Sequence, residues 1–156
     1  MPVIELQTYI KANRAIVFDL SRSIDLHKIS TQHTHEEAIA GKITGLIELH
    51  ESVTWKAKHL GVYQTLTSKI TAMEKPQFFE DQQEKGIFSY FIHGHFFEIQ
   101  DDDTLMIDRF EYQSPLGFLG RLADKLFLEK YMTQLLQKRN AIIKEFAESG
   151  RWKEVL

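Results

Sequence analysis

The feature that most limits the possible folds is a series of short strand-like segments followed by one long helical segment. Alternating apolar and polar residues, separated by glycine and proline, predict strands over 51–59, 62–73, 77–85, 87–100 and 104–113. After Ser114, and as far as about Ser149, the spacing of apolar residues is that of an amphipathic helix. Neighbouring strands joined by tight turns pair antiparallel, and their apolar face needs a helix to cover it. The sequence therefore predicts an α+β fold.

The N-terminal part of the chain adds one strand and two short helices. Residues 1–10 read as a strand, and Asn13 can cap a helix that carries Ile16, Val17 and Leu20 at helical spacing. A second short helix is expected over 24–29. Residues 30–45 are polar and end between glycines, which predicts a long, mobile connection.

Length and composition exclude several classes of protein. With 156 residues, we expect one domain spanning 1–156. A net charge of -3 gives no electrostatic basis for binding nucleic acid, and the absence of cysteine excludes disulfides and thiolate metal sites. Residues 1–14 lack the pattern of a secretory signal, and no apolar run is long enough to span a membrane. We therefore expect a soluble, cytoplasmic protein.

The most informative segment is the hairpin around the acidic run Asp101-Asp102-Asp103. A two-residue loop at Asp101-Asp102 and a four-residue loop over 100–103 give the same strand register. In that register four cross-strand pairs share one face: His95 with Asp108, Phe97 with Met106, His93 with Phe110, and Phe91 with Tyr112. The predicted face is aromatic and apolar except for the two histidines and the aspartate.

The pairing of His95 with Asp108 on an apolar face has three interpretations. The first is a buried structural network in which His95 or Arg139 holds Asp108, since Arg139 lies within the apolar stripe of the long helix. The second is anchoring of a small molecule, because a few polar groups in an aromatic concavity are typical of ligand sites. The third is catalysis by the pair.

Metal binding is the weaker interpretation of the histidines. His93 and His95 share one strand face, and His59 lies on the apolar face of its own strand, so the three could bind one ion. No motif with known metal-ligand spacing accompanies them, and hydrogen-bonded imidazoles packed among aromatic rings are favoured instead. The sequence therefore predicts no metal and no cofactor.

The start of the long helix is out of phase with the rest. Leu119, Leu122 and Leu126 lie opposite the later apolar stripe, so either the helix breaks near 126–128 or its first turns cover another surface. That surface is the mouth of a pocket or a second subunit. A homodimer or a regulatory interaction module is therefore an alternative.

Several short motifs, in order along nearly the whole chain, resemble one family. They are Val53-Thr54-Trp55 followed by His59, Pro76-x-x-Phe79-x-Asp81-x-x-x-x-Gly86-x-Phe88, His93-x-His95-x-Phe97, Thr104-x-Met106-x-Asp108, Pro115-x-Gly117, and Tyr131, Leu135 and Arg139. Together they resemble the bacterial ligand-binding proteins of the SRPBCC superfamily. This superfamily shares the helix-grip fold of START domains, the birch-pollen allergen Bet v 1 and aromatase/cyclases.

The resemblance implies a curved, seven-stranded antiparallel sheet wrapped around the long C-terminal helix, with two short helices after the first strand. We expect the seventh strand in 43–49 or in a split of 87–100. The resemblance also implies a cavity between sheet and helix, in proteins that bind lipids, hormones, polyketides or other apolar molecules. The cavity and rim positions that it implies are Trp55, His59, Phe79, His95, Asp108, Tyr112 and Arg139, and the hairpin register adds Phe91 and His93 as ligand-binding candidates.

The leading hypothesis is therefore a non-enzymatic protein that binds or carries a hydrophobic small molecule. The alternative is an enzyme similar to polyketide cyclases and dehydratases, in which His95 and Asp108 act as general acid and base. The resemblance supplies no common catalytic set, and so assigns no reaction to these residues.

Overall fold

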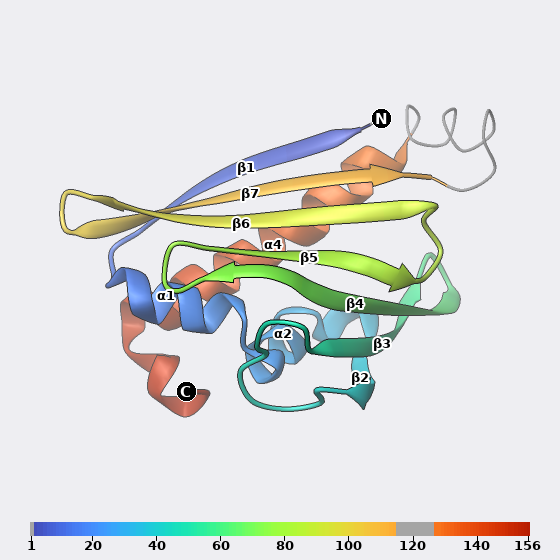
Figure 1. The fold of residues 1–156 in the computed structure, drawn as a ribbon, viewed down its shortest axis with the longest axis horizontal. Coiled ribbons are helices and arrows are strands. Elements are labelled where there is room, and N and C mark those ends of the chain that lie inside the picture. Colours follow the sequence, from blue (N-terminus) through green and yellow to red (C-terminus); the bar gives the residue numbers. More distant parts are fainter. Residues whose placement is uncertain (1, 115–126) are drawn as a thin grey trace.

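The computed structural model describes residues 2–114 and 127–156. The strands are β1 Val3–Ile10, β2 Glu37–Gly41, β3 Ser52–His59, β4 Val62–Glu74, β5 Phe78–Lys85, β6 Tyr90–Gln100 and β7 Asp103–Gln113. The helices are α1 Arg14–Ser21, α2 Ile24–Ser30 and α4 Glu129–Ser149, and the shorter 3-10 helices are η1 Gln32–Thr34 and η3 Arg151–Glu154. Helix α4 runs along the curved sheet, with α1 and α2 packed against it (Figure 1). The α+β class and the order of the elements are confirmed.

Within the described residues, the sheet has seven strands in the order β1-β7-β6-β5-β4-β3-β2, and every neighbouring pair is antiparallel. Six strands lie where the sequence predicted them, apart from small differences at their ends. The seventh is β2, so its predicted location in 43–49 or in a split of 87–100 is wrong. β6 instead pairs with β7 without interruption from Tyr90 to Gln100.

Strand β2 lies inside the segment 30–45, which the sequence predicted to be a mobile connection, and η1 lies there too. Most of β2 is exposed, and its pairing with β3 shifts register between Ala38 and Ala40. An exposed edge strand with a bulge has no buried face, so it carries none of the alternation by which strands are recognised. This explains why the prediction missed it.

Side-chain caps fix the two N-terminal helices. The side-chain oxygen of Asn13 accepts a hydrogen bond from the backbone N–H of Ala15 at 2.8 Å, as expected for the start of α1. The hydroxyl of Ser23 accepts from the N–H of Leu26 at 3.1 Å at the start of α2. These caps satisfy N–H groups that have no partner inside the helix.

The β6–β7 hairpin has the predicted register. Asp101 and Asp102 form the two-residue turn, with φ angles of 50° and 66° that match the twist of the flanking strands. His95 pairs with Asp108, and the other three predicted pairs are also present. The inward residues of β7, from Thr104 to Tyr112, are all buried. The polar residues of this face therefore lie inside the molecule.

Helix α4 places the predicted apolar stripe against the sheet, with Leu136, Ile143 and Phe146 buried. Two side chains of α4 also bind the backbone around the end of β1. The Nζ atom of Lys144 donates to the carbonyl of Tyr9 at 2.6 Å, and Glu148 accepts from the N–H of Lys11 at 2.9 Å. The predicted contacts of Leu119, Leu122 and Leu126 lie outside the described residues. No helix among the described residues is long and apolar enough to cross a membrane.

Candidate functional site

Three neighbouring strands bring four polar side chains together on the inner face of the sheet. His95 on β6 lies opposite Asp108 on β7, and His93 on β6 lies opposite Asp81 on β5. Residues two apart on a strand share a face, so all four side chains point the same way. Asp81, His93, His95 and Asp108 are called the His–Asp cluster below.

Asp108 accepts hydrogen bonds on both carboxylate oxygens. Its Oδ1 lies 2.9 Å from His93 Nε2, 3.2 Å from His95 Nδ1 and 3.3 Å from Arg139 Nη1. Its Oδ2 accepts from Asn140 Nδ2 at 2.8 Å. Burial alone would raise the pKa of Asp108, but the bonds from both histidines and the charge of Arg139 outweigh it and hold the pKa well below its usual range. Asp108 is therefore a buried, ionised acceptor.

Burial and neighbouring groups also shift the pKa values of His93 and Asp81. Burial, followed by the neighbouring His95, lowers the pKa of His93 to about 4, so this imidazole is neutral at pH 7. Burial opposes ionisation of Asp81, but its hydrogen bond with His95 Nε2, 2.8 Å long, prevails and lowers the pKa of Asp81. The rings of His93 and His95 lie 3.8 Å apart between centroids. Since His93 Nε2 donates to ionised Asp108, its Nδ1 carries the free lone pair.

Arg139 connects the cluster to both helical layers. From α4, its Nη1 donates to Asp108 and to the side-chain oxygen of Asn140 at 3.0 Å. Its Nη2 donates to the hydroxyl of Ser21 at 2.7 Å, at the end of α1. The sequence predicted that Arg139 points toward the sheet, and it does. Both terminal nitrogens are engaged with protein acceptors.

A cavity of about 220 Å³ lies beside the cluster, between the sheet, α2 and α4. Its apolar walls include Trp55 on β3, Phe79 on β5 and Phe91 on β6, together with side chains from α4. Its polar lining is larger than the sequence indicated and includes Ser21, Arg22, Ser23, His27, Thr31, Thr34, Glu36, His59, Ser68, Asp81, His93, His95 and Arg139. The cavity is thus amphipathic.

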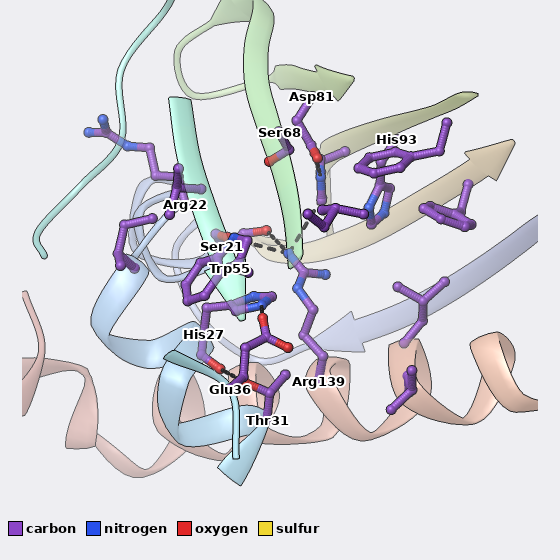
Figure 2. A pocket seen from close by; sticks show the side chains of 18 of the residues that line it. Ser21, Arg22, His27, Thr31, Glu36, Trp55, Ser68, Asp81, His93 and Arg139 are labelled. Carbon is purple, nitrogen blue, oxygen red and sulfur yellow. Dashed lines mark hydrogen bonds and ion pairs between the residues drawn. The ribbon is translucent and has the colours of Figure 1, made fainter. Parts of the chain in front are cut away.

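The polar groups of the cavity stand on two sides of it. Figure 2 shows Asp81 and His93 on one side, His27 and Glu36 on the other, and the Arg139 side chain reaching between them. His27 Nε2 lies 2.6 Å from Glu36 Oε1, and the His27 ring packs on Trp55 with centroids 4.3 Å apart. No sequence pattern indicated this second pair, because Glu36 lies in a segment without apolar periodicity.

Most of the predicted site residues face the cavity. Trp55, His59, Phe79, Phe91, His93, His95 and Arg139 line it. Asp108 is behind the two histidines and does not line it, and Tyr112 is in an apolar cluster with Ile4, Phe110 and Leu136. His59 donates to or accepts from the Tyr131 hydroxyl at 2.8 Å and is not grouped with His93 and His95. Asp81 joins these two histidines instead.

The sequence analysis also missed three residues that bond to the predicted His95, Asp108 and Arg139: Asp81, Asn140 and Ser21. Asp81 alternates with Phe79 on β5, and this spacing places it on the inner face, so a signal was present. Asn140 follows Arg139 and could have been found only by locating the buried stripe of α4 to within one residue. For Ser21 the sequence contains no signal, because the position of the end of α1 depends on tertiary packing.

Among the polar atoms on the cavity wall without a hydrogen-bond partner in the described ranges are the indole N–H of Trp55 and the hydroxyl of Ser68. Both residues are buried. Buried polar groups are normally paired, either with protein or with water or a ligand. Both atoms are therefore available to a molecule in the cavity.

The sheet, the helix held against it and the cavity between them define the Bet v 1-like helix-grip fold. One solved structure with this fold is TTHA0849 from Thermus thermophilus, with a TM-score of 0.72 and 18% identity over 91% of this chain and 97% of that chain. Another is Ara h 8.0201, with a TM-score of 0.64 and 12% identity over 94% of this chain and 97% of that chain. The di-domain ARO/CYC protein StfQ from the steffimycin biosynthetic pathway is similar over 96% of this chain and 51% of that chain (TM-score 0.75, 11% identity). No protein-family model and no curated protein matches the sequence. The predicted resemblance is confirmed at the level of the fold.

Proposed function

We propose that the protein binds or carries a small, largely apolar molecule in the cavity between the sheet and α4. The observation that carries this proposal is a cavity with aromatic walls and unpaired polar atoms, among them the indole N–H of Trp55 and the hydroxyl of Ser68. Apolar walls supply most of the binding free energy, and a few polar atoms orient the ligand. Further support comes from the helix-grip fold, because the family that the sequence motifs resemble uses this fold to bind apolar molecules.

The size of the cavity limits the ligand. A volume of about 220 Å³ corresponds to roughly seven molecules of liquid water. It lies below the range of about 300–1,000 Å³ typical of drug-sized ligands. The proposed ligand is therefore compact, with one or two rings, and a long acyl chain does not fit the cavity in this conformation.

The charge of the wall further restricts the ligand. Asp81 and Glu36 are carboxylates facing the cavity, and the terminal nitrogens of Arg139 are already engaged with Ser21, Asn140 and Asp108. An anionic group would enter close to these carboxylates, and no lining residue in the described part of the chain offers a free guanidinium to compensate it. The proposed ligand is neutral or cationic.

Native mass spectrometry of freshly purified protein and fluorescence titration with naphthol test this proposal. We expect naphthol to bind at least about tenfold more tightly than naphthoate, which has the same ring system and a negative charge. Ser68→Leu should abolish naphthol binding by filling the cavity. The control is Thr65→Leu, because Thr65 lies on the exposed face of the same strand. No uptake by the wild type, or equal binding by the two variants, contradicts the proposal.

The cyclase or dehydratase alternative is less well supported by the geometry. As acid and base, His95 and Asp108 would both have to reach a substrate, but Asp108 does not line the cavity. Each ring nitrogen of His95 already faces a carboxylate, of Asp81 or Asp108. If turnover of a polyketide-like ketone is found, loss of that turnover in Asp108→Asn and His95→Ala would restore the alternative.

A further inference from the structure

The His–Asp cluster has the composition of a metal site as well as of a hydrogen-bond network. One ligand atom each from Asp81, His93 and His95 lies within 4.8 Å of the other two. The three residues lie on the adjacent strands β5 and β6, well inside the sheet, so their backbones are held rigidly. All three also line the cavity.

Asp108 orients both imidazoles from behind. It lies 2.9 Å from Nε2 of His93 and 3.2 Å from Nδ1 of His95, so each ring has one nitrogen committed to the same carboxylate. The opposite nitrogens point away from Asp108: Nε2 of His95 lies 2.8 Å from Asp81 Oδ1, and Nδ1 of His93 carries a free lone pair. A carboxylate that fixes the tautomer and orientation of a histidine is the usual outer partner of a metal-bound imidazole.

The charges of the cluster are unevenly compensated. Asp108 is paired with Arg139 and also accepts from Asn140. The carboxylate of Asp81, in contrast, has a hydrogen bond only with His95 among the residues that the structure describes. A largely buried carboxylate without a full cationic partner is costly, and a cation beside it removes this cost. The excess negative charge thus lies on the side of the cluster that faces the cavity.

We propose that Asp81, His93 and His95 bind a divalent first-row transition metal ion, such as Zn²⁺ or Fe²⁺, at the wall of the cavity. Two imidazoles and one carboxylate suit these ions, and three protein ligands leave coordination positions open to the cavity. Ligand atoms sit about 2.0–2.2 Å from such an ion. The ligand atoms, which lie within 4.8 Å of one another, must therefore close around it when it binds. The ion takes the place of the proton between Asp81 and His95.

The inference does not rest on the proposed function. A metal ion can bind whether or not an organic molecule occupies the rest of the cavity, and naphthol binding can persist in protein that takes up no metal.

Titration of tag-free, chelator-treated protein with Co²⁺ tests the proposal. We expect one equivalent of Co²⁺ to produce visible d–d absorption bands that Zn²⁺ then abolishes, with Zn²⁺ binding confirmed by calorimetry. Asp81→Asn should weaken binding at least about tenfold and remove the bands. This variant is preferred because Asp81 is less buried than the histidines, and circular dichroism establishes that it remains folded.

The matched controls are His59→Gln and Glu36→Gln, which remove an imidazole and a carboxylate from other parts of the same cavity. Both should bind Co²⁺ as the wild type does. Absence of the bands in the wild type overturns the proposal, and so does unchanged binding by Asp81→Asn. Equal weakening in the three variants would place the ion elsewhere and overturn it as well.

Discussion

Replacing Asp108 by asparagine tests whether the buried network holds the fold together. Asparagine has nearly the same shape but no charge, so Arg139, only 6% exposed, loses the carboxylate that it pairs with. The side-chain amide of the new asparagine also faces the side-chain amide of Asn140, which donates to Asp108 at 2.8 Å in the wild type. Removing one partner of a buried ion pair costs about 3–5 kcal/mol, because the remaining charge stays buried without compensation. For a chain of this length that corresponds to a fall in Tm of about 10 °C.

The double variant Asp108→Asn, Arg139→Met separates loss of the ion pair from general damage to the core. It removes the uncompensated charge, so its free energy of unfolding should exceed that of Asp108→Asn, with a coupling energy of about 1–3 kcal/mol. Urea unfolding followed by circular dichroism measures the wild type, Asp108→Asn, Arg139→Met and the double variant. Asp101→Asn, in the exposed turn of the same hairpin, is the control and should be neutral. Asp108→Asn within about 1 kcal/mol of the wild type, or strictly additive effects, would refute the reasoning.

Three further predictions concern pH and backbone conformation. The pKa of His93 falls from 6.5 to about 4 on folding, so between these pH values the unfolded chain binds a proton that the folded chain does not. The free energy of unfolding of the metal-free wild type, measured in urea, should therefore fall by up to about 3 kcal/mol as the pH is lowered from 6.5 to 4, and that of His93→Gln should fall less. Gly41→Ala should lower the Tm more than Gly150→Ala does. Both glycines have a positive φ, but only at Gly41 would a Cβ atom lie 2.3 Å from a backbone oxygen, that of Ser52. Equal changes in Tm would count against this steric reason. Leu60, 62% exposed with φ 52°, should be replaceable by asparagine with a gain of about 0.5–1 kcal/mol, and a lower Tm would contradict this.

The hairpin shows how much of the fold and of the site could be read from the sequence. The two aspartates of the turn fix the register, and the register places His95 beside Asp108 without knowledge of the rest of the structure. Local chemistry and period-two alternation are sufficient here. The same alternation could not reveal β2, whose residues are mostly exposed.

The depth of each side chain in the site could not be predicted. Alternation assigns His95, Asp108 and Tyr112 to the inner face, but it does not distinguish the wall of a cavity from solid core. That distinction depends on where α4 and α2 lie against the curved sheet, which involves residues far apart in the chain. Asp81 reaches His95 only because β5 pairs with β6 in one particular register.

Within the described residues, β1 and β2 are the outer strands of the sheet, so each has an edge that could pair with a strand from another molecule. Near the end of β1, helix α4 contacts the backbone, where Lys144 binds the Tyr9 carbonyl and Glu148 binds the Lys11 amide. At the opposite edge, β2 is short and bulged. Such edges resist the addition of foreign strands. The architecture thus discourages aggregation through continuous intermolecular sheets and disfavours self-association by that route.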